Sequence, residues 1–196
     1  MLDKDTRNRI IRLIHKEVVP AIGCTEPMAV ALCTAKAAET LGRTPETINV
    51  LLSANILKNA MGVGIPGTGM IGLPIAIALG ALIGKSDYKL EVLKDLTPEA
   101  LEAGKQYIAG KHIDIKLKEG ITEKLYIEVC CKAAGSESTA IIAGGHTSFV
   151  YLGKDGKALL DNRTDTTAGE EEEDIRLNMR LVYDFATTAP VEEISF

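Results

Sequence analysis

The sequence contains no tryptophan, and aromatic residues make up only 4% of its 196 residues. Aliphatic side chains must therefore supply most of the buried surface, and 46% hydrophobic with 25% charged residues is typical of a globular protein. The length suits one large domain or two small ones. Basic residues are scattered and the formal net charge is −5, so the basic stripe that neutralises phosphates is missing and we expect no nucleic-acid partner.

Cysteine is scarce, and its spacing excludes the common zinc and redox motifs. No pair has the C-x-x-C spacing, and the four residues are Cys24, Cys33, Cys130 and Cys131. Cys130 and Cys131 are neighbours on an expected strand, where successive side chains point to opposite faces, so they are poor disulfide partners. From the charged, amphipathic N-terminal residues we expect no secretory signal, and we expect reduced thiols in a cytoplasmic protein.

Long uninterrupted apolar segments are also missing. Residues 59–84 carry no charge, but glycines and prolines break this stretch. About a dozen continuous helical residues remain, fewer than the roughly twenty that a membrane span needs. We therefore expect no membrane partner and interpret residues 71–83 as a buried central helix.

The patterns that are present predict an α+β fold, in which a helical region with this central apolar helix joins an antiparallel sheet layer carrying one helix. Hydrophobic periodicity and capping residues predict the other helices at residues 5–18, 26–41, 97–109 and 175–186. Short β-branched or alternating segments predict strands at residues 47–53, 88–93, 112–118, 125–132, 138–143 and 148–152.

This pattern divides the chain into three expected regions. Residues 1–86 form a mainly helical region with Cys24 and a glycine-rich loop, and residues 87–160 form the sheet subdomain. Residues 161–196 form an acidic linker and a C-terminal helix that leads into a missing C-terminal half.

Cys24 is the first candidate for chemistry. It follows Gly23 and precedes Thr25, Glu26 and Pro27, which we expect to cap and begin a helix. Amide N–H groups and the helix dipole at such a position stabilise a thiolate and lower the thiol pKa. The alternative is that Cys24 is a small buried hydrophobic side chain.

A glycine-rich loop at residues 55–69 is the second candidate. Gly62–Gly67 spells G-x-G-x-x-G, which leaves a nucleotide-binding oxidoreductase domain open as an alternative function. The loop lies well after its strand, however, and Pro66 removes an N–H group that a pyrophosphate would need. We interpret the loop as backbone that packs tightly or that holds a small anion such as a substrate carboxylate.

Two polar residues complete the candidates. Asn59 lies in an apolar stretch and is either part of the loop scaffold or a substrate contact. His146 follows two glycines on an expected turn, where it is either a general acid or base or a structural histidine.

Three segments together resemble the signatures of a known family. Residues 20–27 (PAIGCTEP), 58–68 (KNAMGVGIPGT) and 144–147 (GGHT) are similar, in order and spacing, to those of the L-cysteine desulfidases, relatives of the iron–sulfur L-serine dehydratase α-subunit. The resemblance implies a lyase that eliminates sulfide from L-cysteine, or water from L-serine, to give pyruvate and ammonia. It implies catalytic roles for Cys24, Glu26 and His146, and a substrate-binding role for Asn59, Gly64, Gly67 and Thr68.

The resemblance also implies a cofactor. The family uses a four-iron four-sulfur cluster with one open iron that binds the leaving group, and Cys24 is then a candidate base or cluster ligand. The principal cluster cysteines of the family lie in a C-terminal half that this sequence does not supply, so we expect most ligands outside this chain. The expected partner is that half or a separate subunit, with a homo-oligomer also open, and we expect the chain alone to be inactive. A non-catalytic binding or assembly domain is the remaining alternative.

Overall fold

The protein is described by a computed structural model that covers residues 2–163 and 175–195. It divides into two compact units. The larger unit comprises Ala21–Thr164, and the smaller unit comprises Met1–Pro20 and Asp165–Phe196. No unit boundary falls at residue 86, because strands from both sides of it share one sheet. The boundary expected at residue 160 lies close to the end of the larger unit.

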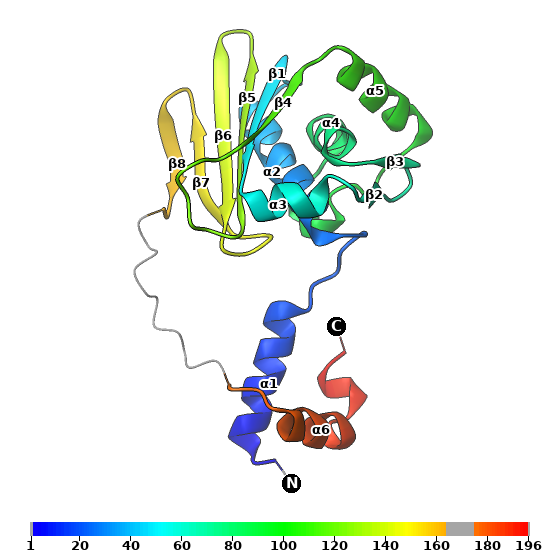
Figure 1. The fold of residues 1–196 in the computed structure, drawn as a ribbon, viewed down its shortest axis with the longest axis vertical. Helices are drawn as coiled ribbons and strands as arrows, with labels where there is room; N and C mark the ends of the chain where they lie inside the picture. The colour runs from blue at the N-terminus through cyan, green and yellow to red at the C-terminus, as the bar shows by residue number, and fades with distance from the viewer. Residues whose placement is uncertain (1, 164–174, 196) are drawn as a thin grey trace. The chain divides into compact units, whose positions relative to one another are not determined.

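The larger unit is built on a six-stranded sheet with the order β4-β1-β5-β6-β7-β8, seen in Figure 1. Its strands are β1 (Thr47–Leu52), β4 (Ile113–Leu117), β5 (Tyr126–Ala133), β6 (Ser136–Ala143), β7 (Phe149–Lys154) and β8 (Lys157–Asp161). Neighbouring strands are antiparallel, except that β1 pairs with β4 in parallel, with Ile48 opposite Ile113. The α+β class with its mostly antiparallel sheet is confirmed, and the parallel pair is an addition that the sequence did not predict.

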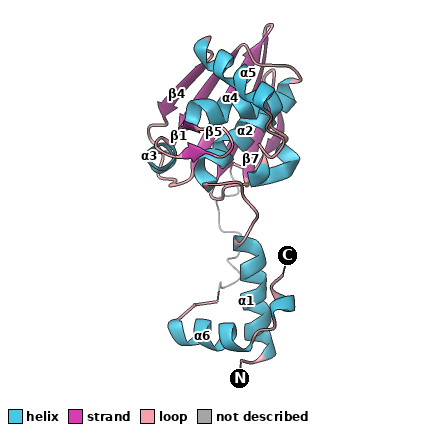
Figure 2. Ribbon diagram, turned by 90° about the vertical axis from the view of Figure 1, so that its right-hand side faces the viewer, coloured by secondary structure: helices cyan, strands magenta, loops and turns pink. Residues whose placement is uncertain are grey.

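Helices cover one face of this sheet (Figures 1 and 2). They are α2 (Thr25–Leu41), α3 (Ala54–Ala60), α4 (Leu73–Ile83) and α5 (Pro98–Ala109). α2 lies against β6, where the Cys33 thiol donates to the Ala140 carbonyl at 3.3 Å and the Ser138 hydroxyl donates to the Ala37 carbonyl at 2.7 Å. α4 is buried over most of its length, as expected for the central apolar helix.

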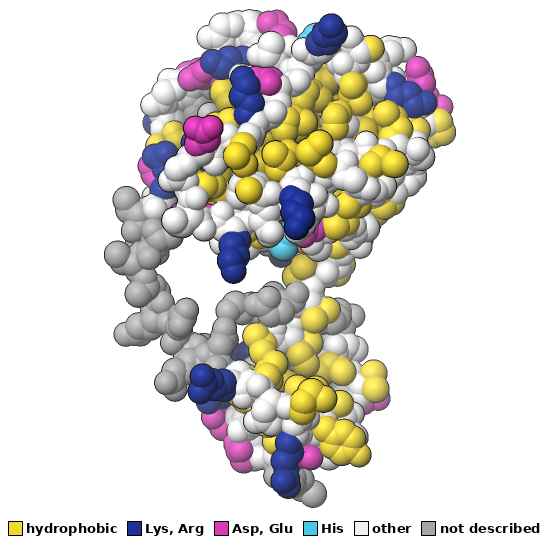
Figure 3. Space-filling view, in the orientation of Figure 1, with side chains coloured by type: hydrophobic (Ala, Val, Ile, Leu, Met, Phe, Trp, Pro, Cys, Tyr) yellow, Lys and Arg dark blue, Asp and Glu magenta, His cyan; other side chains and the backbone are white. Residues whose placement is uncertain are grey.

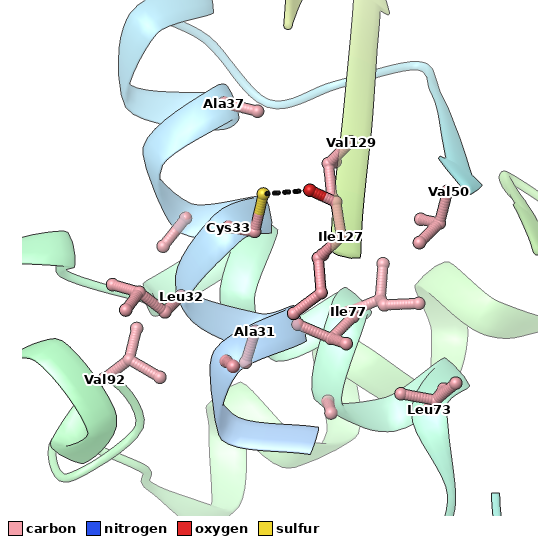
Figure 4. Packing of buried hydrophobic residues seen from close by; sticks show 14 of the residues in the cluster. Ala31, Leu32, Cys33, Ala37, Val50, Leu73, Ile77, Val92, Ile127 and Val129 are labelled. Carbon is pink, nitrogen blue, oxygen red and sulfur yellow. Dashed lines mark hydrogen bonds between the residues drawn. The ribbon is translucent and has the colours of Figure 1, made fainter. Parts of the chain in front are cut away.

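The core between α2, α4 and the sheet is aliphatic, as the lack of tryptophan predicts. Figure 4 shows Ile77 of α4 beside Ile127 of β5, and Leu32 on another side of α2 beside Val92. Burying one such side chain stabilises the fold by about 1.5–3 kcal/mol. The helix whose N-terminus carries Cys24 is therefore held in place by a tightly packed core.

Two predictions about local structure in this unit are wrong, and one strand was missed. Residues 88–93 do not form a strand, since Ser86–Glu91 is a 3-10 helix, η1, whose first backbone N–H donates to the Glu39 carboxylate at 2.7 Å. The expected loop at residues 55–69 contains helix α3 and a short hairpin of β2 (Gly64–Ile65) and β3 (Met70–Ile71). The edge strand β8 was not predicted.

The smaller unit is helical. It contains α1 (Lys4–Glu17), α6 (Met179–Thr188) and the 3-10 helix η2 (Val191–Glu193). α6 begins later than predicted, because the Asn178 side chain caps it by accepting from the Leu181 N–H at 2.9 Å. The acidic linker expected after residue 161 falls, from residue 164 to residue 174, outside the described residues.

In residues 2–163 and 175–195, no helix is long and apolar enough to cross a membrane.

Candidate functional site

The loop before α2 presents Cys24 at the very start of the helix. Gly23 has a φ of +84°, a left-handed conformation that favours glycine, and it turns the chain into α2. Cys24 follows in an extended conformation and is itself the N-cap residue. The expectation that Thr25 caps the helix is wrong, because Thr25 is the first helical residue and its hydroxyl donates to Glu26 instead.

Cys24, Glu26 and Asn59 form a connected cluster at this helix end. The Cys24 thiol donates to one Glu26 carboxylate oxygen, with Sγ and Oε2 2.9 Å apart. The other oxygen accepts a hydrogen bond from the Asn59 amide at 3.3 Å. One carboxylate thus links a thiol from the first signature segment to an amide from the second.

The electrostatics of this cluster oppose the prediction made for the thiol. The pKa of Cys24 is raised, first by burial and then by its hydrogen bond to the Glu26 carboxylate. The backbone N–H groups of Glu26 and Thr25 do lower this pKa, as the helix N-terminus predicts, but their effect is smaller. The expected depression of the thiol pKa is therefore wrong for this chain.

Glu26 responds in the opposite direction. Its pKa is lowered, chiefly because the carboxylate accepts the hydrogen bond from the Cys24 thiol, with further help from Asn59 and Thr25. The shared proton consequently resides on sulfur, and the cluster at neutral pH is a thiol beside a carboxylate. Such a pair can hold one proton and pass it across a single hydrogen bond.

The glycine-rich loop lies directly against the Cys24 loop. A Cβ atom placed on Gly23 would lie 2.7 Å from the Pro66 side chain, so the two loops touch. Asn59 reaches Glu26 from the last turn of α3, a helix that begins where the Ser53 side chain accepts a hydrogen bond from the Ile56 N–H. The contact between the two loops depends on this unpredicted helix.

Two of the expected substrate-binding residues of that loop, Gly67 and Thr68, belong to a tight turn. The Thr68 side chain is buried, and its hydroxyl donates to the Ile65 carbonyl at 2.7 Å and accepts from the Met70 N–H at 2.9 Å. Gly67 has a φ of +76° in the same turn, and Gly64 is an exposed residue of β2. The single hydroxyl proton of Thr68 is already donated to a backbone carbonyl, so the observed role of this side chain is to close the β2–β3 turn.

His146 lies in the turn between β6 and β7, at the same end of the sheet as Cys24. Going from the C-terminus of α2 toward its N-terminus, the helix contacts first Lys154, then Ser138 and then Ala140. The helix therefore runs toward the C-terminal end of β6, and its N-terminus points toward the turn that follows this strand. The ring of His146 is not among the contacts that join Cys24, Glu26 and Asn59.

The remaining cysteines do not converge on Cys24. Cys33 and Cys131 are buried between α2 and the sheet, where burial raises the pKa of both thiols. Cys130 points to the opposite face of the sheet, as the strand alternation predicts. In the part of the chain that the structure describes, no group of three or more His, Cys, Asp or Glu side chains is placed to hold a metal ion.

A neighbouring pocket of about 360 Å³ was missed by the sequence analysis. It opens beside the two loops, and its lining includes Ile22, Pro66, Leu96, Thr97 and Leu101. These segments are far apart in the sequence, and no motif marks the stretch from residue 93 to residue 101. The pocket is largely apolar and contains none of the three residues of the cluster.

The fold and the site define an α+β domain that carries a thiol–carboxylate–amide cluster at the N-terminus of a central helix. No family model matches this chain, and no solved structure matches it.

The similar chains are UPF0597 proteins. One from Bacteroides fragilis is 67% identical over 195 residues, covering all of this chain and 46% of the relative. Another, from Bacteroides thetaiotaomicron, is 69% identical over 192 residues, covering 97% of this chain and 44% of the relative. A third, from Porphyromonas gingivalis, is 49% identical over 201 residues, covering all of this chain and 46% of the relative. The chain spans about half the length of the curated relatives that it matches.

Proposed function

We propose that this chain is the N-terminal part of an iron–sulfur-dependent amino-acid lyase that eliminates sulfide from L-cysteine, or water from L-serine. One observation carries the proposal. The hydrogen bond between Asn59 and Glu26 joins the first and second signature segments, which are more than thirty residues apart in the sequence. The turn with His146, the third segment, lies at the same end of the sheet.

The proposed reaction needs a group that takes the α-proton of the substrate. After its removal the bond from the β-carbon to sulfur or oxygen breaks, and the resulting enamine hydrolyses to pyruvate and ammonia. Cys24 is the candidate base, and its own proton must first leave sulfur. Glu26 lies 2.9 Å from that sulfur and is the acceptor within reach. Asn59 donates to the other Glu26 oxygen and so fixes the direction of the carboxylate.

The residues of this chain do not fit a complete four-iron four-sulfur cluster. Cluster ligands are thiolates, whereas Cys33 and Cys131 are buried thiols and Cys130 points away across the sheet. Cys24 is the one cysteine beside the candidate site. We therefore assign most or all of the cluster ligands to the part of the relatives that this chain does not span, and we expect this chain alone to be inactive.

The test compares this chain with a full-length relative, both reconstituted anaerobically with iron and sulfide. Sulfide and pyruvate are measured with L-cysteine, and pyruvate with L-serine. We expect turnover by the full-length protein and none by the 196-residue chain. Full-length protein that holds a cluster and converts neither amino acid would overturn the lyase proposal, and an active 196-residue chain would overturn the placement of the cluster ligands.

Variants of the full-length protein test the cluster of side chains. Replacing the cysteine that corresponds to Cys24 by serine should lower kcat at least about 100-fold, the usual contribution of a positioned base. The matched control is serine at the position of Cys130, which faces away from the site and should leave kcat unchanged. Equal effects of the two substitutions would contradict the role given to Cys24.

A further inference from the structure

The smaller unit buries little apolar surface of its own. Among its described residues, the buried hydrophobic side chains are Ile10 of α1 and Phe185 of α6. Arg7 joins the two helical segments, since its guanidinium pairs with Glu193 at 2.7 Å, donates to the Thr188 carbonyl and lies over the Phe185 ring. The apolar surface buried in so small a core is not enough to stabilise a unit of this size by itself.

Exposed hydrophobic side chains concentrate on this unit. Eleven large hydrophobic side chains are exposed among the described residues, and seven of them belong here although the other unit is far larger. The seven are Val18, Val19, Leu177, Met179, Val182, Tyr183 and Val191. Figure 3 shows hydrophobic side chains gathered on the visible face of this unit.

Helix α6 carries two apolar faces. Leu181 and Phe185, four residues apart, form the face that is half-buried or buried within the unit. Met179, Val182 and Tyr183 follow the i, i+3, i+4 spacing of a second face and are exposed, with Met179 at 84%.

The polar face of α6 is correspondingly narrow. Arg180 and Asp184 mark it, with their charged groups 3.9 Å apart. At 100° per residue, apolar residues occupy about 200° of the circumference, about twice the stripe of an ordinary surface helix. A helix with so wide an apolar surface is typical of one that is packed against other elements on both sides.

We propose that the exposed face of α6, together with Val191, is the docking surface for the half of the relatives that this chain does not span. The relatives match this chain over 44–46% of their own length, so more than half of each relative lies outside it. That half is covalently attached in the relatives, which gives it a high effective concentration at this surface that a second copy of the chain does not have. The α1–α6 unit is then the beginning of a second domain, and α6 is one of its core helices. The inference rests on the greater length of the relatives and does not depend on the proposed lyase activity.

Hydrogen exchange, measured without substrate, tests this inference. The amides of α6 are followed in the 196-residue chain and in the same chain extended by the remaining length of a relative. We expect α6 to exchange at least tenfold more slowly in the extended protein, with the amides of β5 and β6 unchanged. Equal exchange of α6 in the two proteins would overturn the proposal, even if the extended protein is an active lyase. A protected α6 in an inactive protein would leave docking intact and refute only the function.

A double substitution, Val182→Asp with Tyr183→Asp, tests the same surface. Both side chains are exposed in the 196-residue chain, so the melting temperature of that chain should not change. In the extended protein the double variant should lose the slow exchange of α6. The matched control is Leu159→Asp on β8, an exposed side chain of the other unit, which should preserve it. If the 196-residue chain is instead a dimer that this double variant dissociates, while the extended protein keeps its protection, a second copy covers the face and the proposal is overturned.

Discussion

Cys24 illustrates how competing local effects decide the state of one thiol. Its place at a helix N-terminus predicts a thiolate, and the amide N–H groups of Thr25 and Glu26 do act in that direction. Burial and the carboxylate of Glu26 act in the other direction and prevail. In this chain the site is therefore a resting thiol, and its activation requires that the charge of Glu26 be neutralised or balanced.

Replacing Glu26 by glutamine should make Cys24 more reactive. The substitution removes the negative charge and the strongest acceptor beside the thiol, both of which raise the Cys24 pKa. The pKa should fall, and alkylation by iodoacetamide at pH 8 should become several-fold faster, because the thiolate is the nucleophile. Peptide mass spectrometry over a pH series measures the rate at Cys24, with Cys130 in the same samples as the internal control. A slower or unchanged rate at Cys24 would show that Glu26 does not hold the proton on sulfur.

At the scale of elements, the position of the site depends on how closely α4 approaches α2. A Cβ atom on Gly80 would lie 2.5 Å from the Ala31 carbonyl oxygen, so only glycine allows this contact. Gly104 of α5 also faces α4, but there a Cβ would meet the ends of the Leu79 and Ile75 side chains at 3.1 and 3.2 Å. One close approach is to rigid backbone and the other to side chains that can shift.

This difference predicts opposite outcomes for two chemically identical substitutions. Gly80→Ala should destabilise the larger unit by about 1–2 kcal/mol, since overpacking costs about 1–3 kcal/mol and the gain in helix propensity is at most about 1 kcal/mol. Gly104→Ala should change stability by less than about 1 kcal/mol, because its neighbours can adjust. Urea denaturation followed by circular dichroism compares the two variants with the parent chain. Equal stability of the two variants would contradict the backbone contact at Gly80.

The sequence predicted elements well where one residue pattern is decisive. The helix that carries Cys24 ends at Gly42 with a φ of +81°, as a C-terminal glycine predicts. The alternation in residues 113–117 correctly indicated β4. Periodicity failed for η1, whose geometry depends on the contact between Ser86 and Glu39 across 47 residues, and for the short helix α3.

The candidate site was predictable only in part, for the same reason. A helix N-terminus at Cys24 follows from local sequence, whereas the hydrogen bond from Asn59 to Glu26 exists only because α3 and α2 are packed together. The role of Thr68 depends on a hairpin too short to leave a pattern. The direction in which the Cys24 pKa shifts depends on burial, which the spacing of residues in the sequence does not reveal.

At the scale of the whole molecule, the two units contrast in how they are stabilised. The larger unit has a continuous aliphatic core that contains the thiols of Cys33 and Cys131. The smaller unit has little core and an exposed apolar face. The stability of this chain therefore rests on the larger unit, and titration of groups buried there should govern how the chain responds to alkaline pH.

Stability of the larger unit should decline above pH 9, and Cys131 should account for a measurable part of the decline. Burial raises the pKa of Cys131 from 9.0 to about 12, and it likewise raises the pKa of Tyr107 from 10.0 to about 12. Between pH 9 and pH 12 the folded chain keeps the Cys131 proton that the unfolded chain has lost. The contribution is therefore complete below pH 9 and declines by about 1.4 kcal/mol per pH unit above it.

Cys131→Val keeps an apolar side chain but cannot titrate, so its free energy of unfolding should decline less steeply by that amount. Urea denaturation under reducing conditions at pH 7, 9, 10 and 11 measures the slopes, with Leu159→Ala at an exposed position of β8 as the control, since it changes no titratable group. Parallel pH dependence of the parent chain and Cys131→Val would mean that the buried thiol titrates alike in the folded and unfolded chains.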